Sequence, residues 1–223
     1  MFWQILLGVW MTAVILASFL YMPATQGLGQ TGRIIVYHVP AAWIAVLAYL
    51  MSMLNAIGCL RRGELRLDRQ ARINAEMGTV FCLLATITGA IWSRGAWGWY
   101  WNWDPRQTSI AVLLLIYAAY FVLRSAISDP DRRARLSAVY SVLAFLTVPF
   151  LVFVVPRVYT SLHPDLINLE QRTFDMDSKM LVVFLAALAG FTGLYAWMYR
   201  LVTRLENLLD KLEHKRGEAE NVG

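Results

Sequence analysis

Residues 137–155, SAVYSVLAFLTVPFLVFVV, form a run of nineteen residues without a charged side chain. About 20 apolar residues in a helix cross the hydrocarbon core of a bilayer, so this run predicts a transmembrane helix. Five further apolar runs lie at residues 3–22, 36–60, 77–93, 108–124 and 180–199. No alternating ten-residue pattern indicates a barrel, and backbone groups in lipid must be satisfied internally. The sequence therefore predicts an all-α polytopic membrane protein with six transmembrane helices.

The composition agrees with this fold class. Of the 223 residues, 58% are hydrophobic and 16% are charged, against roughly 25% charged residues in soluble domains. We expect one six-helix transmembrane domain at residues 1–200 and a charged helical tail at residues 201–223. Leucines recur in the tail at helical spacing, at Leu201, Leu205, Leu208 and Leu212. This stripe predicts contact with a partner or with the membrane surface, or else a solvated extension of the last helix.

The basic residues predict the orientation of the chain. Fourteen Lys and Arg lie in the loop after the second helix, around the loop after the fourth and in the C-terminal tail, against six on the other side. Because cytoplasmic segments carry the excess, both termini are expected in the cytoplasm. Residues 23–35, 94–107 and 156–178 then face outward, into the periplasm of a Gram-negative bacterium. The net charge of +5 is spread over these loops and forms no single basic stripe, which argues against nucleic acid as a partner.

Several common motifs are absent from the sequence. The two cysteines, Cys59 and Cys82, form neither a CxxC nor a CxxCH motif, so no dithiol redox pair and no covalent haem attachment site is encoded. No GxxxxGK[ST] loop is present either. The chain therefore has no ATPase motif of its own, and we expect a binding or transfer subunit and not an enzyme.

The most unusual segment is the outward-facing stretch 97–108, WGWYWNWDPRQT, in which four tryptophans alternate. Trp97, Trp99, Trp101 and Trp103 would share one face of an extended segment and would spread over about half the circumference of a helix. Tryptophan also favours membrane interfaces, but such a belt needs only one or two rings at each helix end. The segment predicts a broad aromatic platform for a planar ligand.

The end of this segment also predicts the start of the fourth helix. Asp104, Pro105 and Gln107 have the N-cap, N1 and N3 pattern of a helix N-terminus, and capping alone would explain Asp104. Arg106 in the first turn opposes the helix dipole unless an anion compensates for it. Arg94 lies on the other side of the tryptophan segment. The two arginines are candidates for binding a carboxylate ligand.

The sequence contains three histidines, and two of them, His38 and His163, lie on the predicted outer side. The third, His214, lies in the cytoplasmic tail, and we interpret it as a solvated side chain. His38 is at the outer end of the second helix, and His163 lies between the fifth and sixth helices. Pro164 is expected to start a short interfacial helix over residues 164–169. A lone histidine near a membrane surface is usually only a polar interface residue, but two on the same face favour a common site.

Two imidazoles beside a wide aromatic surface suit a metalloporphyrin. Each imidazole nitrogen can bind the iron axially, and aromatic rings pack against the macrocycle. Arg94 and Arg106, together with backbone donors at the start of the fourth helix, provide partners for two propionates. Zinc fits less well, because zinc sites generally have three or four protein ligands.

The tryptophan segment also resembles the signature of the tryptophan-rich (WWD) haem-handling membrane proteins, Trp-Gly-x-x-Trp-x-Trp-Asp-x-Arg-x-Thr. The matching residues are Trp97, Gly98, Trp101, Trp103, Asp104, Arg106 and Thr108. With six helices and two outer histidines, the chain is similar to the CcmC family, also called haem exporter protein C. The larger haem lyases share the signature but have more helices and additional histidines.

This resemblance implies a function and a set of partners. Haem b would be held at the periplasmic face of the bacterial inner membrane by the tryptophan segment, including Trp99, with His38 and His163 as axial ligands. The haem would be delivered to the membrane-anchored chaperone CcmE for cytochrome c biogenesis. The resemblance also implies work beside the ABC transporter subunits CcmA and CcmB and the small protein CcmD.

Two alternatives come from other functional classes. A haem exporter or channel subunit of an ABC transporter complex would carry polar residues along a path through its helices, and helices 3 to 6 offer mostly Thr and Ser. An electron-transfer subunit of the cytochrome b kind would need histidines at both depths of the membrane. The inner halves of the predicted helices contain none.

Overall fold

The structure is a computed structural model of residues 1–223. It describes every residue except 1, 26, 164–166, 169–172, 175 and 223, and it leaves the side chains of 164–175 and 213–223 undescribed. The α-helices are α1 (Phe2–Leu20), α2 (Ile35–Arg62), α3 (Leu65–Trp97), α4 (Pro105–Ser125), α5 (Pro130–Pro149), α6 (Val155–Val158) and α7 (Ser178–Val222). A 3-10 turn, η1 (Gln30–Ile34), leads into α2, and a π-helical turn, η2 (Phe150–Val154), joins α5 to α6.

Among the described residues, six helical segments are long and apolar enough to cross a membrane, which confirms the predicted fold class. The chain is therefore a multi-pass membrane protein. The expected helix after Pro164 is wrong at Ile167–Asn168, which form the short strand β1 and pair antiparallel with β2 (Thr173–Phe174). Two-residue strands satisfy their backbone groups across the pair, whereas a single helical turn would leave most of them unpaired. Residues 164–166 and 169 of the expected helix lie outside the described residues.

Local sequence signals set the helix ends. Glycines in the left-handed conformation follow α2 and α3, with φ of 69° at Gly63 and 84° at Gly98. Asp-Pro pairs start α4 and α5, where the side chains of Asp104 and Asp129 accept backbone hydrogen bonds at the first turn. The tryptophan segment is thus closed by a glycine stop at one end and an aspartate cap at the other.

The predicted boundaries are wrong at two charged helix starts. α3 begins at Leu65 and not at 77, and α5 begins at Pro130 and not at 137. The first turns of both helices carry charged residues, which a search for apolar runs does not include. Most of the arginines assigned to these two loops therefore lie on helices.

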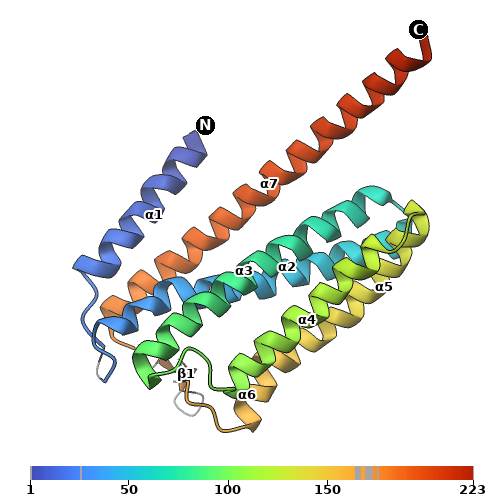
Figure 1. Cartoon of the computed structure of the whole chain (residues 1–223). Helices are drawn as coiled ribbons and strands as arrows, with labels where there is room; N and C mark the ends of the chain where they lie inside the picture. The colour runs from blue at the N-terminus through green and yellow to red at the C-terminus, as the bar shows by residue number, and fades with distance from the viewer. Residues whose placement is uncertain (1, 26, 164–166, 169–172, 175, 223) are drawn as a thin grey trace.

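The helices form a bundle in which α2 to α5 lie side by side and α7 packs against α2 and α3 (Figure 1). α1 packs mainly against α7, where Trp10 Nε1 donates a hydrogen bond to Ala186 O over 2.9 Å. Tyr49 and Tyr117 stack in the core with their ring centroids 3.5 Å apart. The core is thus centred on α2, α3 and α4.

α7 runs without a break from Ser178 to Val222, so the expected tail is helical. Its stripe leucines Leu201, Leu205, Leu208 and Leu212 are exposed. The division of the chain at residue 200 stays a prediction.

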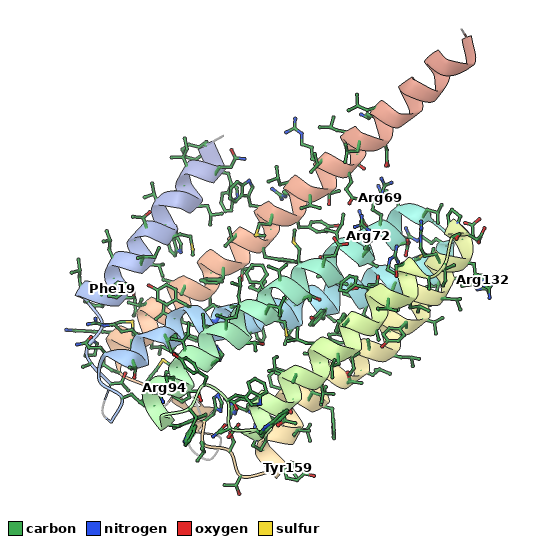
Figure 2. All side chains as sticks on the ribbon, viewed as in Figure 1. Phe19, Arg69, Arg72, Arg94, Arg132 and Tyr159 are labelled. Atoms are coloured by element: carbon green, nitrogen blue, oxygen red, sulfur yellow. The ribbon has the colours of Figure 1, made fainter. Side chains whose placement is uncertain are left out.

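The connections of the bundle gather at two ends. Both chain termini and the turns after α2 and α4 lie toward one end, and the connections after α1, α3 and α6 lie toward the other (Figure 1). Figure 2 shows Arg94 and Tyr159 at the latter end and Arg69, Arg72 and Arg132 at the former. The segments that we expected to face outward are therefore neighbours. Which end faces the cytoplasm stays a prediction.

Candidate functional site

Asp104 occupies the centre of the candidate site. Its side chain caps α4 by accepting a hydrogen bond from Arg106 N over 2.9 Å, as its position before Pro105 predicts. It also accepts a hydrogen bond from Leu162 N over 2.8 Å. Ser161 Oγ lies 3.0 Å from Asp104 Oδ1 and 3.1 Å from Oδ2 and donates to the carboxylate as well. One carboxylate therefore joins the end of the tryptophan segment to the connection after α6, a role that its capping position does not predict.

Burial alone would raise the pKa of the Asp104 carboxyl. The hydrogen bonds from Leu162 N, Arg106 N and Ser161 Oγ outweigh that effect and hold the pKa below its usual value. The side chain is 1% exposed. The site therefore contains a buried carboxylate that is ionised at neutral pH.

His163 lies directly beside this carboxylate. Its Nδ1 is 3.2 Å from Asp104 Oδ1. The ring packs against Trp97 edge-on, with centroids 4.8 Å apart, and against Trp92 at 5.3 Å. Burial lowers the pKa of His163, and Asp104 opposes this shift only in part, so the imidazole is neutral at pH 7. A neutral imidazole is the form that binds metals.

His38 projects from α2 against α3. Its Nδ1 is 3.1 Å from Thr88 Oγ1. The next residue of α3, Gly89, leaves room for the ring, because a Cβ there would lie 2.9 Å from His38 Cε1. The histidine thus lies against the helix that leads into the tryptophan segment.

The structure brings the two histidines together. His38, His163 and Arg106 lie within electrostatic range of one another, although they come from α2, the connection after α6 and α4. The sequence separates the two histidines by more than a hundred residues. Their convergence with the start of α4 is a product of the fold.

The tryptophans take up neither of the two regular arrangements that we considered. Trp97 is the last residue of α3, and residues 98–104 are not helical. Trp101 and Trp103 meet edge-on with centroids 5.7 Å apart, and Trp103 has a φ of 61°. Trp99 and Trp103 are 68% and 72% exposed. The segment therefore divides into a half-buried ring beside His163, that of Trp97, and exposed rings farther along.

The two arginines beside the segment differ in their contacts. Arg94 donates a hydrogen bond from Nη1 to Gly98 O and lies 5.8 Å from the centroid of the Tyr100 ring. Arg94 therefore holds the start of the tryptophan segment against the end of α3. Arg106 lies in the first turn of α4 within range of both histidines. Of the two, Arg106 is the one whose charge acts on the histidines.

Several residues of this site were not singled out from the sequence. Ser93 Oγ donates to Trp99 O over 2.7 Å and so holds the path of the segment. Gln107, which the sequence does predict at position N3 of α4, has the same effect because its Oε1 accepts from Asn102 N over 2.9 Å. Thr88 and Ser161 contact the histidine and the carboxylate from other elements. These are ordinary polar residues with no motif spacing, and only the fold reveals their contacts. The side chain of His214 lies outside the described residues.

Comparison with known proteins identifies relatives of this chain. Heme exporter protein C of Bradyrhizobium diazoefficiens is 31% identical over 201 residues, covering 88% of this chain and 76% of the relative. Its counterpart in Rhodobacter capsulatus is 33% identical over 193 residues, covering 85% and 78%. A "Putative cytochrome c biosynthesis ccmC-like mitochondrial protein" of Arabidopsis thaliana is 28% identical over 205 residues, covering 91% and 77%. The sequence model of the family described as "CcmC: Heme exporter protein C" matches residues 1–218. The chain therefore belongs to the haem exporter protein C family.

Proposed function

We propose that this chain handles haem for cytochrome c maturation by binding haem b beside the tryptophan segment and transferring it to the chaperone CcmE. The observation that carries the proposal is the convergence of His38 and His163 from separate elements, with Trp97 packed against His163. Histidine imidazole is a common axial donor for haem iron. The names of the relatives, which refer to heme export and cytochrome c biosynthesis, support the same function.

The chemistry of the surrounding residues suits this cargo. The exposed rings of Trp99 and Trp103 offer apolar faces for a macrocycle. The guanidinium of Arg106 offers a positive charge, and the N-terminus of α4 a partial positive charge, for a propionate. The buried Asp104 carboxylate is already engaged by hydrogen bonds from Leu162 and Ser161, so it is not a partner for the propionates.

We further propose that the site faces the periplasm of a bacterial inner membrane and that the chain works with CcmA, CcmB and CcmD. The basic residues that favour this orientation include Arg69, Arg72 and Arg132, which lie at the end of the bundle opposite the site (Figure 2). The chain has no ATPase motif, so ATP would be used by a partner.

The binding step is tested by the visible spectrum of the purified protein. We expect a Soret band in the wild type and its loss in the double variant His38→Ala, His163→Ala. His214→Ala in the charged tail is the matched control and should keep the wild-type spectrum. A Soret band unchanged in the double variant would disprove the axial ligand assignment.

The transfer step is tested separately by mixing the haem-loaded protein with purified CcmE. Haem should leave the chain and appear on the chaperone. A site that transfers its cargo must release it, so ligation is expected to be incomplete or to depend on the oxidation state of the iron. Haem that does not exchange in the presence of CcmE would contradict transfer while leaving haem binding intact.

A further inference from the structure

The hydrogen bonds around His163 determine which of its ring nitrogens carries the proton. Both side-chain oxygens of Asp104 act as hydrogen-bond acceptors. Arg106 N, Leu162 N and Ser161 Oγ already donate to it. The contact of 3.2 Å between His163 Nδ1 and Asp104 Oδ1 is therefore favourable only if Nδ1 bears the hydrogen. In the neutral ring this leaves the lone pair on Nε2.

The same reasoning applies to His38 with a different partner. Thr88 Oγ1 lies 2.7 Å from Leu84 O and 3.2 Å from Ala85 O, so its only hydrogen is donated to its own helix backbone. The hydroxyl can then only accept from His38 Nδ1, which lies 3.1 Å away. His38 also carries its proton on Nδ1 and presents the lone pair of Nε2.

The two partners differ in charge. A carboxylate accepts a stronger hydrogen bond than a hydroxyl and makes the imidazole a better electron donor to a metal at its other nitrogen. Asp104 is itself fixed by three donors from two elements, whereas Thr88 lies on one helix. The imidazole of His163 is consequently the stronger electron donor of the two.

We infer that Asp104 and Thr88 fix both histidines with the lone pair on Nε2 and make them unequal ligands of the haem iron, His38 being released first during transfer and His163 last. The haem part of this inference rests on the proposed function. During transfer the bond between the iron and His38 Nε2 breaks first, and the imidazole keeps its lone pair. The iron gains a donor from the receiving protein in exchange. Asp104 is a positioning residue that acts through His163.

The proton positions are tested in the haem-free protein. NMR of protein carrying ¹⁵N-labelled histidine distinguishes a protonated Nδ1 from a protonated Nε2, and the single variants His38→Ala and His163→Ala assign the signals. We expect Nδ1 to be protonated and Nε2 unprotonated in both rings. A protonated Nε2 at either histidine in the neutral form would overturn the inference without any bearing on haem binding.

The role of Asp104 is tested with Asp104→Asn in the haem-loaded protein. Asparagine can still cap α4, but it removes the charge behind His163. We expect haem affinity to fall by about tenfold or more and the reduction potential to rise, because His163 becomes a weaker donor to the ferric iron. Asp129→Asn is the matched control, since Asp129 is also an N-cap residue before a proline and accepts a hydrogen bond from Arg132 N at the start of α5. Equal effects of the two substitutions on affinity and potential would overturn the inference.

The inequality is tested by comparing the single histidine variants and Thr88→Val. Haem affinity should fall more in His163→Ala than in His38→Ala, and Asp104→Asn should have a larger effect than Thr88→Val. An equal or reversed order would overturn the assignment of His163 as the stronger ligand and His38 as the weaker one, although haem binding itself would stand. If both histidine variants kept the wild-type Soret band, the proposed function would fail as well.

Discussion

Gly89 is the residue at which packing and ligand position are most directly linked. A Cβ at this position would lie 2.9 Å from His38 Cε1. The contacting atom is the end of a side chain, so the ring would move and the helices would not. Gly89→Ala is therefore expected to weaken haem binding with little change in thermal stability. Gly8→Ala on α1, where a Cβ meets nothing within 4 Å, is the control. Unchanged haem affinity in Gly89→Ala would contradict this position of His38.

Trp103 combines an exposed ring with an unusual backbone. It is the one residue other than glycine with positive φ among the residues that the structure describes. Such strain costs on the order of 1–3 kcal/mol and often marks a functional site. Trp103→Gly should relieve it, so this variant is expected to be more stable than Trp103→Ala by about 1 kcal/mol.

Both Trp103 variants lose the ring and should bind haem equally weakly, about two- to tenfold below wild type. Thermal unfolding in detergent and a haem titration separate the two effects. If Trp103→Gly were no more stable than Trp103→Ala, the backbone strain would be absent. If both kept wild-type affinity, the exposed ring would have no part in haem binding.

The ionisation of His163 predicts a pH dependence. Burial lowers the pKa of this histidine, and Arg106 lowers it further, whereas Asp104 opposes the shift. The ring therefore takes up its proton only below the usual value of 6.5. Haem affinity should stay constant as the pH falls from 8 to about 6.5 and decrease below that, since the protonated ring cannot bind iron.

The contribution of Asp104 to this ionisation can be measured in the haem-free protein. Asp104→Asn removes the charge that stabilises the imidazolium, so the pKa of His163 should fall further. An NMR titration of the labelled histidines gives both values. A pKa above 6.5 in the wild type, or an increase in the variant, would contradict this account of the site.

At the scale of single residues, the sequence predicted the unusual members of the site and missed the ordinary ones. Tryptophans at strict alternation and histidines in an apolar chain are rare enough to be noticed before any fold is known. Thr88, Ser93 and Ser161 are common in membrane helices and loops, and their importance comes from which atoms they meet. These contacts join residues that are far apart in the chain, and no local sequence pattern specifies such contacts.

At the scale of the helices, a buried ion pair joins α3 to α4. Arg124 donates from Nη1 and Nη2 to the two oxygens of Asp68 over 2.6 and 2.9 Å, and both side chains are 9% exposed. Asp68→Asn leaves a buried positive charge without its partner, which typically costs about 3–5 kcal/mol. Unfolding in detergent measures this loss.

The exposed pair Arg62–Glu64 provides the control for this measurement. Its atoms are 4.0 Å apart, and its side chains are 70% and 44% exposed. Glu64→Gln should change stability by less than about 1 kcal/mol, because water screens such pairs. Comparable losses in Asp68→Asn and Glu64→Gln would mean that the buried pair does not hold the two helices together.

The same pair explains why the start of α3 could not be predicted from hydropathy. The early turns of the helix carry Asp68, Arg69 and Arg72, whose charges suggest a loop. In the fold, Asp68 meets α4, and the two arginines form ion pairs with Asp210 and Glu206 of α7. The partners lie far away in the sequence, so the compensation for these charges is visible only in the structure. Where a helix lies wholly in an apolar run, as α1 does, the prediction agrees within two residues.

At the scale of the whole molecule, the described residues form six helices that are long and apolar enough to cross a membrane. Both termini lie toward one end of the bundle, and the connections that carry the candidate site lie toward the other (Figure 1). The side of the membrane that the candidate site faces is therefore fixed once either end is located. Basic residues around Arg132 predict that the end with the termini is cytoplasmic. The location of Tyr100, in the tryptophan segment, follows from that of Arg132.

Cysteine labelling in intact cells tests this orientation. Tyr100 is 61% exposed and Arg132 is also exposed, and the native Cys59 and Cys82 are buried, so background labelling should be low. A membrane-impermeant maleimide should label Tyr100→Cys in intact cells and should label Arg132→Cys only after the membrane is permeabilised. The opposite pattern would place the histidines and the tryptophan segment in the cytoplasm. Transfer of haem to a periplasmic chaperone would then be impossible from this site, even if its affinity for haem were confirmed.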